Sequence, residues 1–190
     1  MTGTLRGGVR AARDVRRALG GAIGHRPPDF LILGAQKAGT TSLLDWLGAH
    51  PRIAPPDRKE VHWFTNHWGR PAAWYRSHFP RRPAGVLSAE ATPYYLFHPA
   101  VPERVARALP DVRCIVLLRD PAARTISHHN HERALGFEDL ELEAALAAER
   151  RRLAGAHERL AADPRARSFA HQHHSYLARS RSTVAGSAPA

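Results

Sequence analysis

The sequence predicts an α/β fold in three layers, with a central parallel β-sheet flanked by helices. Short apolar runs typical of buried strands alternate with segments of helical periodicity. Two of these runs lead through a short polar turn straight into a helix. The length of 190 residues corresponds to about one domain, and the 43% share of hydrophobic residues is typical of a globular protein.

The first half of the chain supplies two strands and two helices. The apolar run "FLILG" (30–34) is of the buried-strand type. The segment "TTSLLDWLGAH" (40–50) has a threonine cap, leucines at helical spacing and a proline after it, which predicts a helix. We expect "KEVHWF" (59–64) to be a loop or short strand and "AAWYRSHFP" (72–80) to be helical. A further strand is expected at 86–90, where a Thr-Pro turn follows.

The second half repeats the alternation and then becomes helical. The segment "VPERVARALP" (101–110) has a proline near each end and predicts a helix. "VRCIVLLRDP" (112–121) contains the clearest strand, and "AARTISHHNHERAL" (122–135) follows as a helix. Residues 138–162 predict one long amphipathic helix. Its apolar stripe consists of Leu140, Leu142, Leu146 and Leu153.

The chain divides into three predicted regions. Residues 1–28 form an Arg-rich segment expected to be a flexible arm, and residues 29–181 form the domain. Residues 182–190 are small, lack periodicity and are expected to be an unstructured tail.

Charge and cysteine content restrict the possible functions. The formal charge of +11 suits a polyanionic or phosphorylated ligand, although it also fits a compositional preference, since nearly all basic residues are arginines. Only Lys37 and Lys59 are lysines, and the two residue types bind anions differently. The single cysteine, Cys114, excludes an intrachain disulfide and is predicted to be buried. A reducing, cytoplasmic compartment is expected, and no apolar run has the length of a transmembrane helix.

The turn "GAQKAGTTS" (34–42) predicts an anion site. It joins a strand to a helix, so backbone N–H groups and the positive end of the helix dipole point at one place. It is not a Walker A loop, because Lys37 precedes the second glycine, Gly39, instead of following it. The hydroxyls that add donors belong to Thr40, Thr41 and Ser42. The alternative is an ordinary turn with a solvated lysine.

The turn "RDPAARTIS" (119–127) repeats this architecture. In open α/β sheets, ligands bind beyond the carboxyl ends of the strands. Arg119 and Ser127 are therefore candidates for binding a second phosphate. The guanidinium of Arg119 can make two charged hydrogen bonds to it, and the hydroxyl of Ser127 can donate one more. The alternative is a surface pair between Arg119 and Asp120.

Together the two turns resemble the sulfotransferase family that uses 3′-phosphoadenosine 5′-phosphosulfate (PAPS). In that family a loop of the form "QKAGTTS" binds the 5′-phosphosulfate, and "R-D/N-P-x-x-R-x-x-S" binds the 3′-phosphate. "KEVHWF" and "AEATPYYL" also resemble family segments, most closely those of the heparan-sulfate-type and bacterial carbohydrate-type branch. The resemblance covers residues 30–181 and implies a P-loop-like three-layer fold.

The resemblance also implies residue roles. Lys37 and Glu60 are the implied catalytic residues, with the lysine at the leaving 5′-phosphate and the carboxylate as general base. The implied PAPS-binding residues are Lys37, Ala38, Gly39, Thr40, Thr41, Ser42, Arg119 and Ser127. The alternative for Glu60 is a surface carboxylate paired with Arg58 or Lys59. No metal and no specific nucleic acid are expected.

Two departures from the family pattern bear on function. Ala91 stands where heparan-type members often carry a lysine, so acceptor choice is expected to differ. After "SYLARSR" the family continues into further helices and a basic loop, whereas this chain continues as "STVAGSAPA". We therefore expect a fold that lacks the usual C-terminal part.

Two histidine clusters and a group of aromatic residues allow more than one interpretation. "HHNHE" (128–132) and "HQHH" (171–174) lack the spacing of common zinc sites, and we expect polar helix surface near an anionic substrate. An aromatic group is expected in the core, with an acceptor-binding wall as the alternative. It consists of Trp63, Phe64, Trp68, Trp74 and Tyr75.

The expected function is sulfuryl transfer from PAPS to a hydroxyl or amine of a carbohydrate or small molecule. The alternatives are an inactive, truncated remnant, another P-loop-like enzyme such as a small kinase, and a basic module that binds polyanions.

Overall fold

The computed structural model describes residues 24–185. Its sheet contains β1 (Phe30–Gly34), β2 (Ala89–Ala91) and β3 (Arg113–Val116). All pairings are parallel, and the strand order is β2-β1-β3. The helices are α2 (Thr40–Gly48), α3 (Ala72–Arg76), the 3-10 helix η1 (Pro93–Leu96), α4 (Val101–Ala108), α5 (Pro121–Ala134), α6 (Leu142–Arg152), α7 (Ala156–Ala162), α8 (Phe169–His173) and α9 (Tyr176–Ala185).

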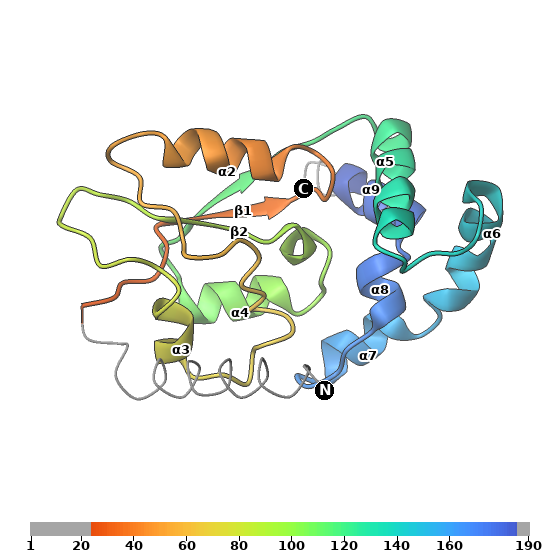
Figure 1. Ribbon diagram of the computed structural model, residues 1–190. Coiled ribbons are helices and arrows are strands. Elements are labelled where there is room, and N and C mark those ends of the chain that lie inside the picture. Colours follow the sequence, from red (N-terminus) through yellow and green to blue (C-terminus); the bar gives the residue numbers. More distant parts are fainter. Residues whose placement is uncertain (1–23, 186–190) are drawn as a thin grey trace, which may run out of the picture.

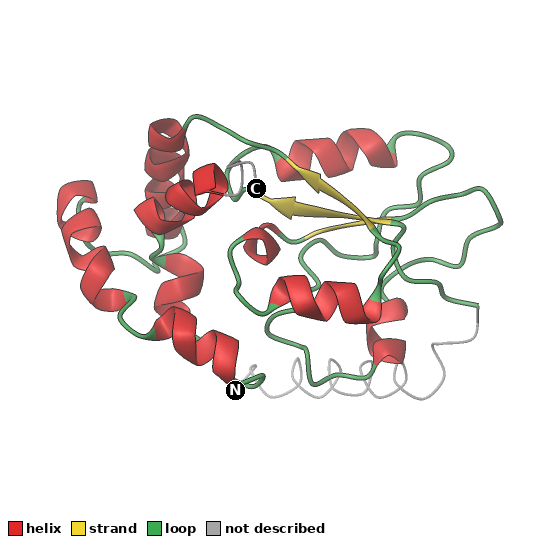
Figure 2. Cartoon of the chain, turned by 180° about the vertical axis from the view of Figure 1, so that it is seen from behind, coloured by secondary structure: helices red, strands yellow, loops and turns green. Residues whose placement is uncertain are grey.

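The predicted three-layer α/β class is confirmed. Figure 1 shows α2 on one face of the sheet and α4 on the other, with α5 to α9 gathered to one side as a helical half. The same division into a sheet half and a helical half is visible from behind in Figure 2. Among the described residues, no helix is long and apolar enough to cross a membrane.

Alternate side chains of β1 build a core on each face of the sheet, as the two-residue period of a strand requires. Phe30 and Ile32 pack with Leu44 of α2. Leu31 packs on the other side, in a cluster that also contains Val61, Trp63, Phe64, Trp74, Tyr75, Phe79, Tyr95 and Val101. The aromatic group is therefore core, with Trp68 packed against it. The interpretation of these rings as an acceptor-binding wall is wrong.

A buried carboxylate lies inside the aromatic core. Glu90 of β2 is 0% exposed and accepts hydrogen bonds from Thr92 Oγ1 and Tyr95 OH, both at 2.7 Å, and from Tyr75 OH. Burial raises the pKa of Glu90, although the three hydroxyl donors act in the opposite direction. Tyr95 OH also accepts a hydrogen bond from Phe64 N at 3.3 Å, so the network extends into the 59–64 segment.

A buried arginine joins the helices of the helical half. Arg124 of α5 is 1% exposed and donates to Ser180 Oγ at 2.8 Å and to Tyr176 O, both on α9. Burial lowers the pKa of Arg124 to about 10, which leaves the guanidinium charged at neutral pH. In the "RDPAARTIS" turn this arginine is thus a structural anchor.

Several sequence expectations need correction. The long helix expected at 138–162 is two helices, because Gly155 adopts a left-handed φ of 64° between α6 and α7. Cys114 is exposed instead of buried, because β3 is an edge strand with no described strand on its outer side. The strand expected at 86–90 is Ala89–Ala91, and Leu87 forms only an isolated bridge with Ile53.

The ends of the expected domain also differ. Residues 24–28 of the expected flexible arm pack on the domain, where His25 Nδ1 contacts Phe79 O at 2.6 Å and Arg26 Nη2 donates to Val86 O at 3.2 Å. Helix α9 continues to Ala185, past the expected start of the tail. The rest of the arm (1–23) and of the tail (186–190) lies outside the described residues.

We expect the protein to lose stability as the pH falls below 6.5. Burial lowers the pKa of His128 and of His171 from 6.5 to about 3, so both rings stay neutral in the folded state. The unfolded chain takes up these protons below pH 6.5. A pKa depressed on folding therefore gives stability that is present above 6.5 and is lost as the pH falls towards the folded value.

The measurement is the Tm by circular dichroism, in steps from about pH 7.5 to about pH 4.5. Glu132 and Glu138, whose folded pKa values are lowered to about 2, contribute a separate loss only below their unfolded value of 4.5. His50→Asn, an exposed site, should show the same slope as the wild type. A Tm that stays constant down to about pH 5 would contradict the role of the buried neutral histidines.

Candidate active site

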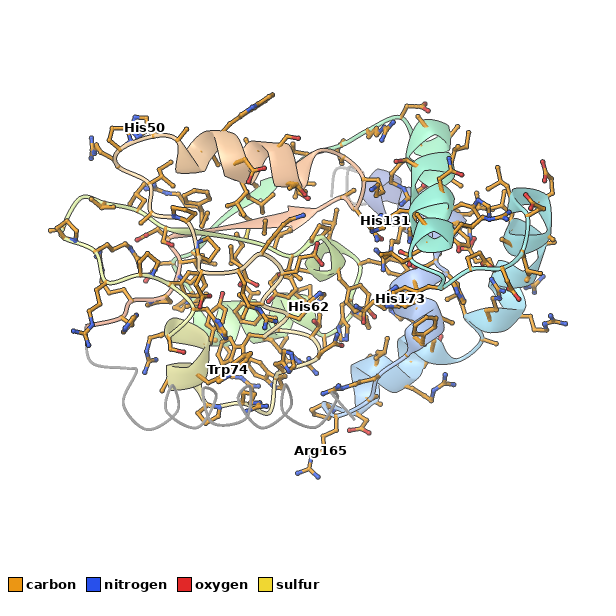
Figure 3. The ribbon with its side chains drawn as sticks, in the orientation of Figure 1. His50, His62, Trp74, His131, Arg165 and His173 are labelled. Carbon is orange, nitrogen blue, oxygen red and sulfur yellow. The ribbon has the colours of Figure 1, made fainter. Side chains whose placement is uncertain are left out.

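A pocket of about 380 Å³ lies between the sheet half and the helical half. The turn after β1 and the start of α2 contribute Gln36, Lys37, Gly39, Thr40, Thr41 and Ser42. The 59–62 segment and η1 contribute Lys59, Glu60, His62, Pro93 and Tyr94. The helical half contributes His131, Glu132, Leu135, Gln172, His173 and Arg179. Figure 3 shows His62 on the sheet side and His131 and His173 on the helical side.

The N-terminus of α2 opens into this pocket without a capping side chain. Gly39 precedes the helix with a φ of 96°, a left-handed conformation that L-residues rarely adopt. Within residues 24–185 no side chain accepts from the first N–H groups, so these groups can bind an anion together with the positive end of the helix dipole. Gly34 is needed for another reason, since a Cβ there would lie 3.0 Å from Leu96 Cβ and from Pro93 O. The turn therefore fits the predicted phosphosulfate cradle.

Lys37 supplies a cation at the same end of the pocket. Among the described residues its ammonium group has no ion-pair partner, and its backbone has a left-handed φ of 68°. Arg119 Nη1 donates to the carbonyl oxygen of Lys37 at 2.8 Å. The strand-end arginine of the second turn thus holds the backbone of the first.

Glu60 lies in the same pocket, between two basic side chains. Its Oε1 is 3.4 Å from Lys59 Nζ, and its Oε2 is 3.3 Å from His62 Nε2. Burial raises the pKa of Glu60, but the contacts with His62 and Lys59 outweigh it, so the net pKa is lowered. Lys59 Nζ also donates to Thr41 Oγ1, which ties the carboxylate segment to α2. The Lys59–Glu60 pair of the alternative interpretation therefore exists, but it lines the pocket.

The backbone is strained where these groups meet. Lys37, Glu60 and His62 have φ values of 68°, 58° and 57°. For a residue with a Cβ this conformation costs on the order of 1–2 kcal/mol. All three line the pocket, and no other non-glycine residue of the described chain has a positive φ. Strain concentrated in this way is typical of a functional site.

The structure brings together most of the predicted site residues. Lys37, Gly39, Thr40, Thr41, Ser42 and Glu60 share the pocket. Ala38 belongs to the same turn without lining the pocket. Arg119 lies next to the loop, through its contact with Lys37, and Ser127 is half-buried on α5 outside the lining. Asp120 caps α5 by accepting a hydrogen bond from Ala123 N at 2.8 Å. This cap accounts for the aspartate without the alternative of an Arg119–Asp120 pair.

The helical wall of the pocket was missed by sequence reasoning. Arg179 of α9 is 4% exposed, and its Nη1 donates to Gln36 Oε1. Burial lowers the pKa of Arg179 to about 10, so it carries a positive charge at neutral pH. The sequence pointed to Arg179 only through the segment "SYLARSR", which resembles the family pattern. Of the histidine clusters, expected on the surface, His128, His129 and His171 are buried. Among residues 24–185 no group of three possible ligands could hold a metal ion.

The geometry combines an anion cradle with a carboxylate. Uncapped N–H groups and Lys37 can stabilise negative charge that develops on a leaving phosphate. Glu60, ionised at neutral pH and partly exposed, can accept a proton from an attacking group. This is the arrangement required for the transfer of a group between an anionic donor and an acceptor hydroxyl or amine.

Comparison with known proteins agrees with this chemistry. Residues 27–177 match the sulfotransferase domain. The chain is 38% identical over 105 residues to human heparan sulfate glucosamine 3-O-sulfotransferase 6, covering 55% of this chain and 30% of that protein. It is 35% identical over 106 residues to the membrane-associated sulfotransferase kil1 of Dictyostelium discoideum, covering 54% and 22%. The chain thus spans less than a third of the length of these relatives.

A solved structure extends the similarity to the fold. The sulfotransferase from Alicyclobacillus acidocaldarius superposes with a TM-score of 0.60 at 27% identity, over 84% of this chain and 69% of that one. The domain match spans both turns, the Glu60 segment and most of the helical half. On this match, this chain belongs to the sulfotransferase domain family.

Proposed function

We propose that the protein transfers a sulfuryl group from PAPS to a hydroxyl or amine of a carbohydrate or small molecule. The observation that carries this proposal is the shared pocket of Lys37, the uncapped α2 N-terminus and Glu60. Family membership supports PAPS as the donor, and the heparan sulfate 3-O-sulfotransferase relatives support a carbohydrate acceptor.

In the proposed step the acceptor oxygen or nitrogen attacks sulfur and forms a new bond to it. The bond from sulfur to the bridging oxygen breaks, and its electron pair stays on the leaving 3′-phosphoadenosine 5′-phosphate. The acceptor proton passes to Glu60, and the ammonium of Lys37 stabilises the leaving phosphate. By analogy with phosphoryl transfer, positioning and electrostatics supply most of the catalysis.

Arg119 and Ser127 are proposed to hold the 3′-phosphate. Arg119 follows β3 at the carboxyl end of the sheet, where it already contacts the phosphosulfate loop. Ser127 lies on α5, two turns from the start of that helix.

Lys37→Ala should weaken binding of 3′-phosphoadenosine 5′-phosphate by about tenfold or more and abolish sulfate transfer, because a charge-assisted contact to the phosphate is lost. Calorimetry measures the binding, and transfer of radiolabelled sulfate measures the activity. Arg165→Ala removes an exposed positive charge far from the pocket and should change neither. Transfer at the wild-type rate in Lys37→Ala would refute the role of the lysine.

Arg119→Ala should remove the preference for a 3′-phosphorylated nucleotide. The Kd values of 3′-phosphoadenosine 5′-phosphate and adenosine 5′-phosphate, measured for both proteins, give the preference directly. In the wild type we expect a ratio of about ten or more, from one bidentate charged contact. If the variant keeps the wild-type ratio, the assignment of the 3′-phosphate to Arg119 is wrong.

Glu60→Gln should leave nucleotide binding intact and lower turnover by about 10²-fold or more, the usual contribution of a general base. The glutamine keeps the shape of the side chain and loses its basicity. Calorimetric binding of the nucleotide is the control for folding. Equal turnover in the two proteins would make Glu60 a structural partner of Lys59 and His62 only.

A further inference from the structure

A second carboxylate lines the pocket on its helical side, whereas Glu60 lines it on the sheet side. Glu132 of α5 is 1% exposed and accepts from Gln36 Nε2 at 3.3 Å. His128 Nε2 lies 3.2 Å from its Oε1, without the alignment of a hydrogen bond. Burial raises the pKa of Glu132, but contacts with His128 and His173 lower it, to about 2. The carboxylate is therefore ionised at neutral pH.

Glu132 fixes the orientation of a histidine that lines the pocket. His173 Nδ1 lies 3.0 Å from Glu132 Oε2. An ionised carboxylate only accepts hydrogen bonds, so Nδ1 carries the proton and donates it. The ring is also packed against Phe169, at 4.4 Å between ring centroids, and against Phe137, at 4.8 Å. Among the described residues His173 Nε2 has no hydrogen-bond partner.

This arrangement differs from that of Glu60 in a way that matters for proton transfer. Both carboxylate oxygens of Glu60 contact a basic side chain, and its pKa is lowered. Each contact occupies one of the lone-pair sites of that oxygen and so competes with a proton from an acceptor. His173 Nε2 is unengaged, and its imidazole is held by a carboxylate on the other nitrogen, as in the catalytic histidines of hydrolases.

We propose that His173 is a second general base of the pocket, oriented by Glu132, which acts on acceptor groups that approach from the helical half. The proposal rests on the proposed sulfate transfer. The acceptor proton passes to His173 Nε2 as the bond to sulfur forms, and the electron pair of the broken sulfur–oxygen bond stays on the leaving phosphate. Glu132 stabilises the resulting imidazolium and stays ionised, so it is a positioning residue.

Charged groups from several elements surround this imidazole. The titratable and charged groups that line the pocket with His173 are Lys37 on the loop, Lys59, Glu60 and His62 on the 59–62 segment, His131 and Glu132 on α5, and Arg179 on α9. His128 lies next to Glu132.

The first test is made on the wild-type chain by imidazole ¹⁵N–¹H NMR, with His173→Asn used to assign the signal. We expect neutral His173 to be protonated at Nδ1, and its signal to shift when 3′-phosphoadenosine 5′-phosphate is added. In Glu132→Gln the preference for a proton on Nδ1 should weaken, because an amide replaces the carboxylate that only accepts hydrogen bonds. A proton on Nε2 of the neutral ring, or a signal that the nucleotide leaves unmoved, would overturn the proposal.

The second test measures sulfate transfer to a panel of sugar hydroxyls and amines. Glu60→Gln should keep a residual turnover that depends on His173. Glu60→Gln/His173→Asn should lose this residual rate by about tenfold or more. His50→Asn in the Glu60→Gln background is the control, because His50 is exposed after α2 and outside the pocket. Equal rates for the single and double variants, or no residual rate, would overturn the second base.

The proposed function and the second base are refuted by different results. A wild-type chain that does not bind 3′-phosphoadenosine 5′-phosphate by calorimetry refutes the proposed function. A chain that binds the nucleotide, with the His173 proton on Nε2 or with equal rates in the two Glu60 backgrounds, refutes only the second base.

Discussion

The buried carboxylate of Glu90 is the constraint on which the sheet half depends. An ionised or neutral carboxyl group at 0% exposure costs free energy unless its oxygens are satisfied, and three hydroxyl donors satisfy them here. The donors come from α3, η1 and the end of β2, so one side chain fixes three segments. Through Tyr95 OH and Phe64 N it also holds the segment that carries Glu60. Removal of the Glu90 carboxylate would leave three buried hydroxyls without this acceptor, at about 1–3 kcal/mol each.

The strained backbone positions around the pocket are stabilised by hydrogen bonds to the sheet and to the segments packed on it. Glu60 N donates to Ala91 O at 3.1 Å, which anchors a residue with a left-handed φ directly to β2. Arg119 does the same for the carbonyl of Lys37. The packed core and these hydrogen bonds offset the conformational cost at three positions. In return, the cation, the helix N-terminus and the carboxylate are held in one pocket before any substrate arrives, which is what electrostatic catalysis requires.

The helical half forms the other wall of the pocket, and charged side chains are buried inside it. Its interior is polar, with Arg124, Glu132 and Arg179 all at 5% exposure or less. Arg124 of α5 donates to two residues of α9, and Gln36 of the loop after β1 contacts both Glu132 and Arg179. The loop is therefore held from both halves of the molecule. Arg119 binds the carbonyl of Lys37 on the sheet side, and Glu132 and Arg179 bind Gln36 on the helical side. Movement of the helical half relative to the sheet would change the pocket directly.

The three-layer class and the anion turn follow from the sequence alone, because they depend on local patterns: apolar runs, glycines before a helix, and a lysine within the turn. Glu60 was implied only by the family resemblance of its segment. The exposure of Cys114 did not follow from the sequence, because it depends on the order of the strands in the sheet. The division of residues 138–162 into two helices was also missed, because it depends on the left-handed conformation of Gly155. The wall of Glu132, His173 and Arg179 was decided only by the tertiary structure. These residues lie on three different helices, and no short-range pattern records which faces meet when α5, α8 and α9 pack against the loop after β1.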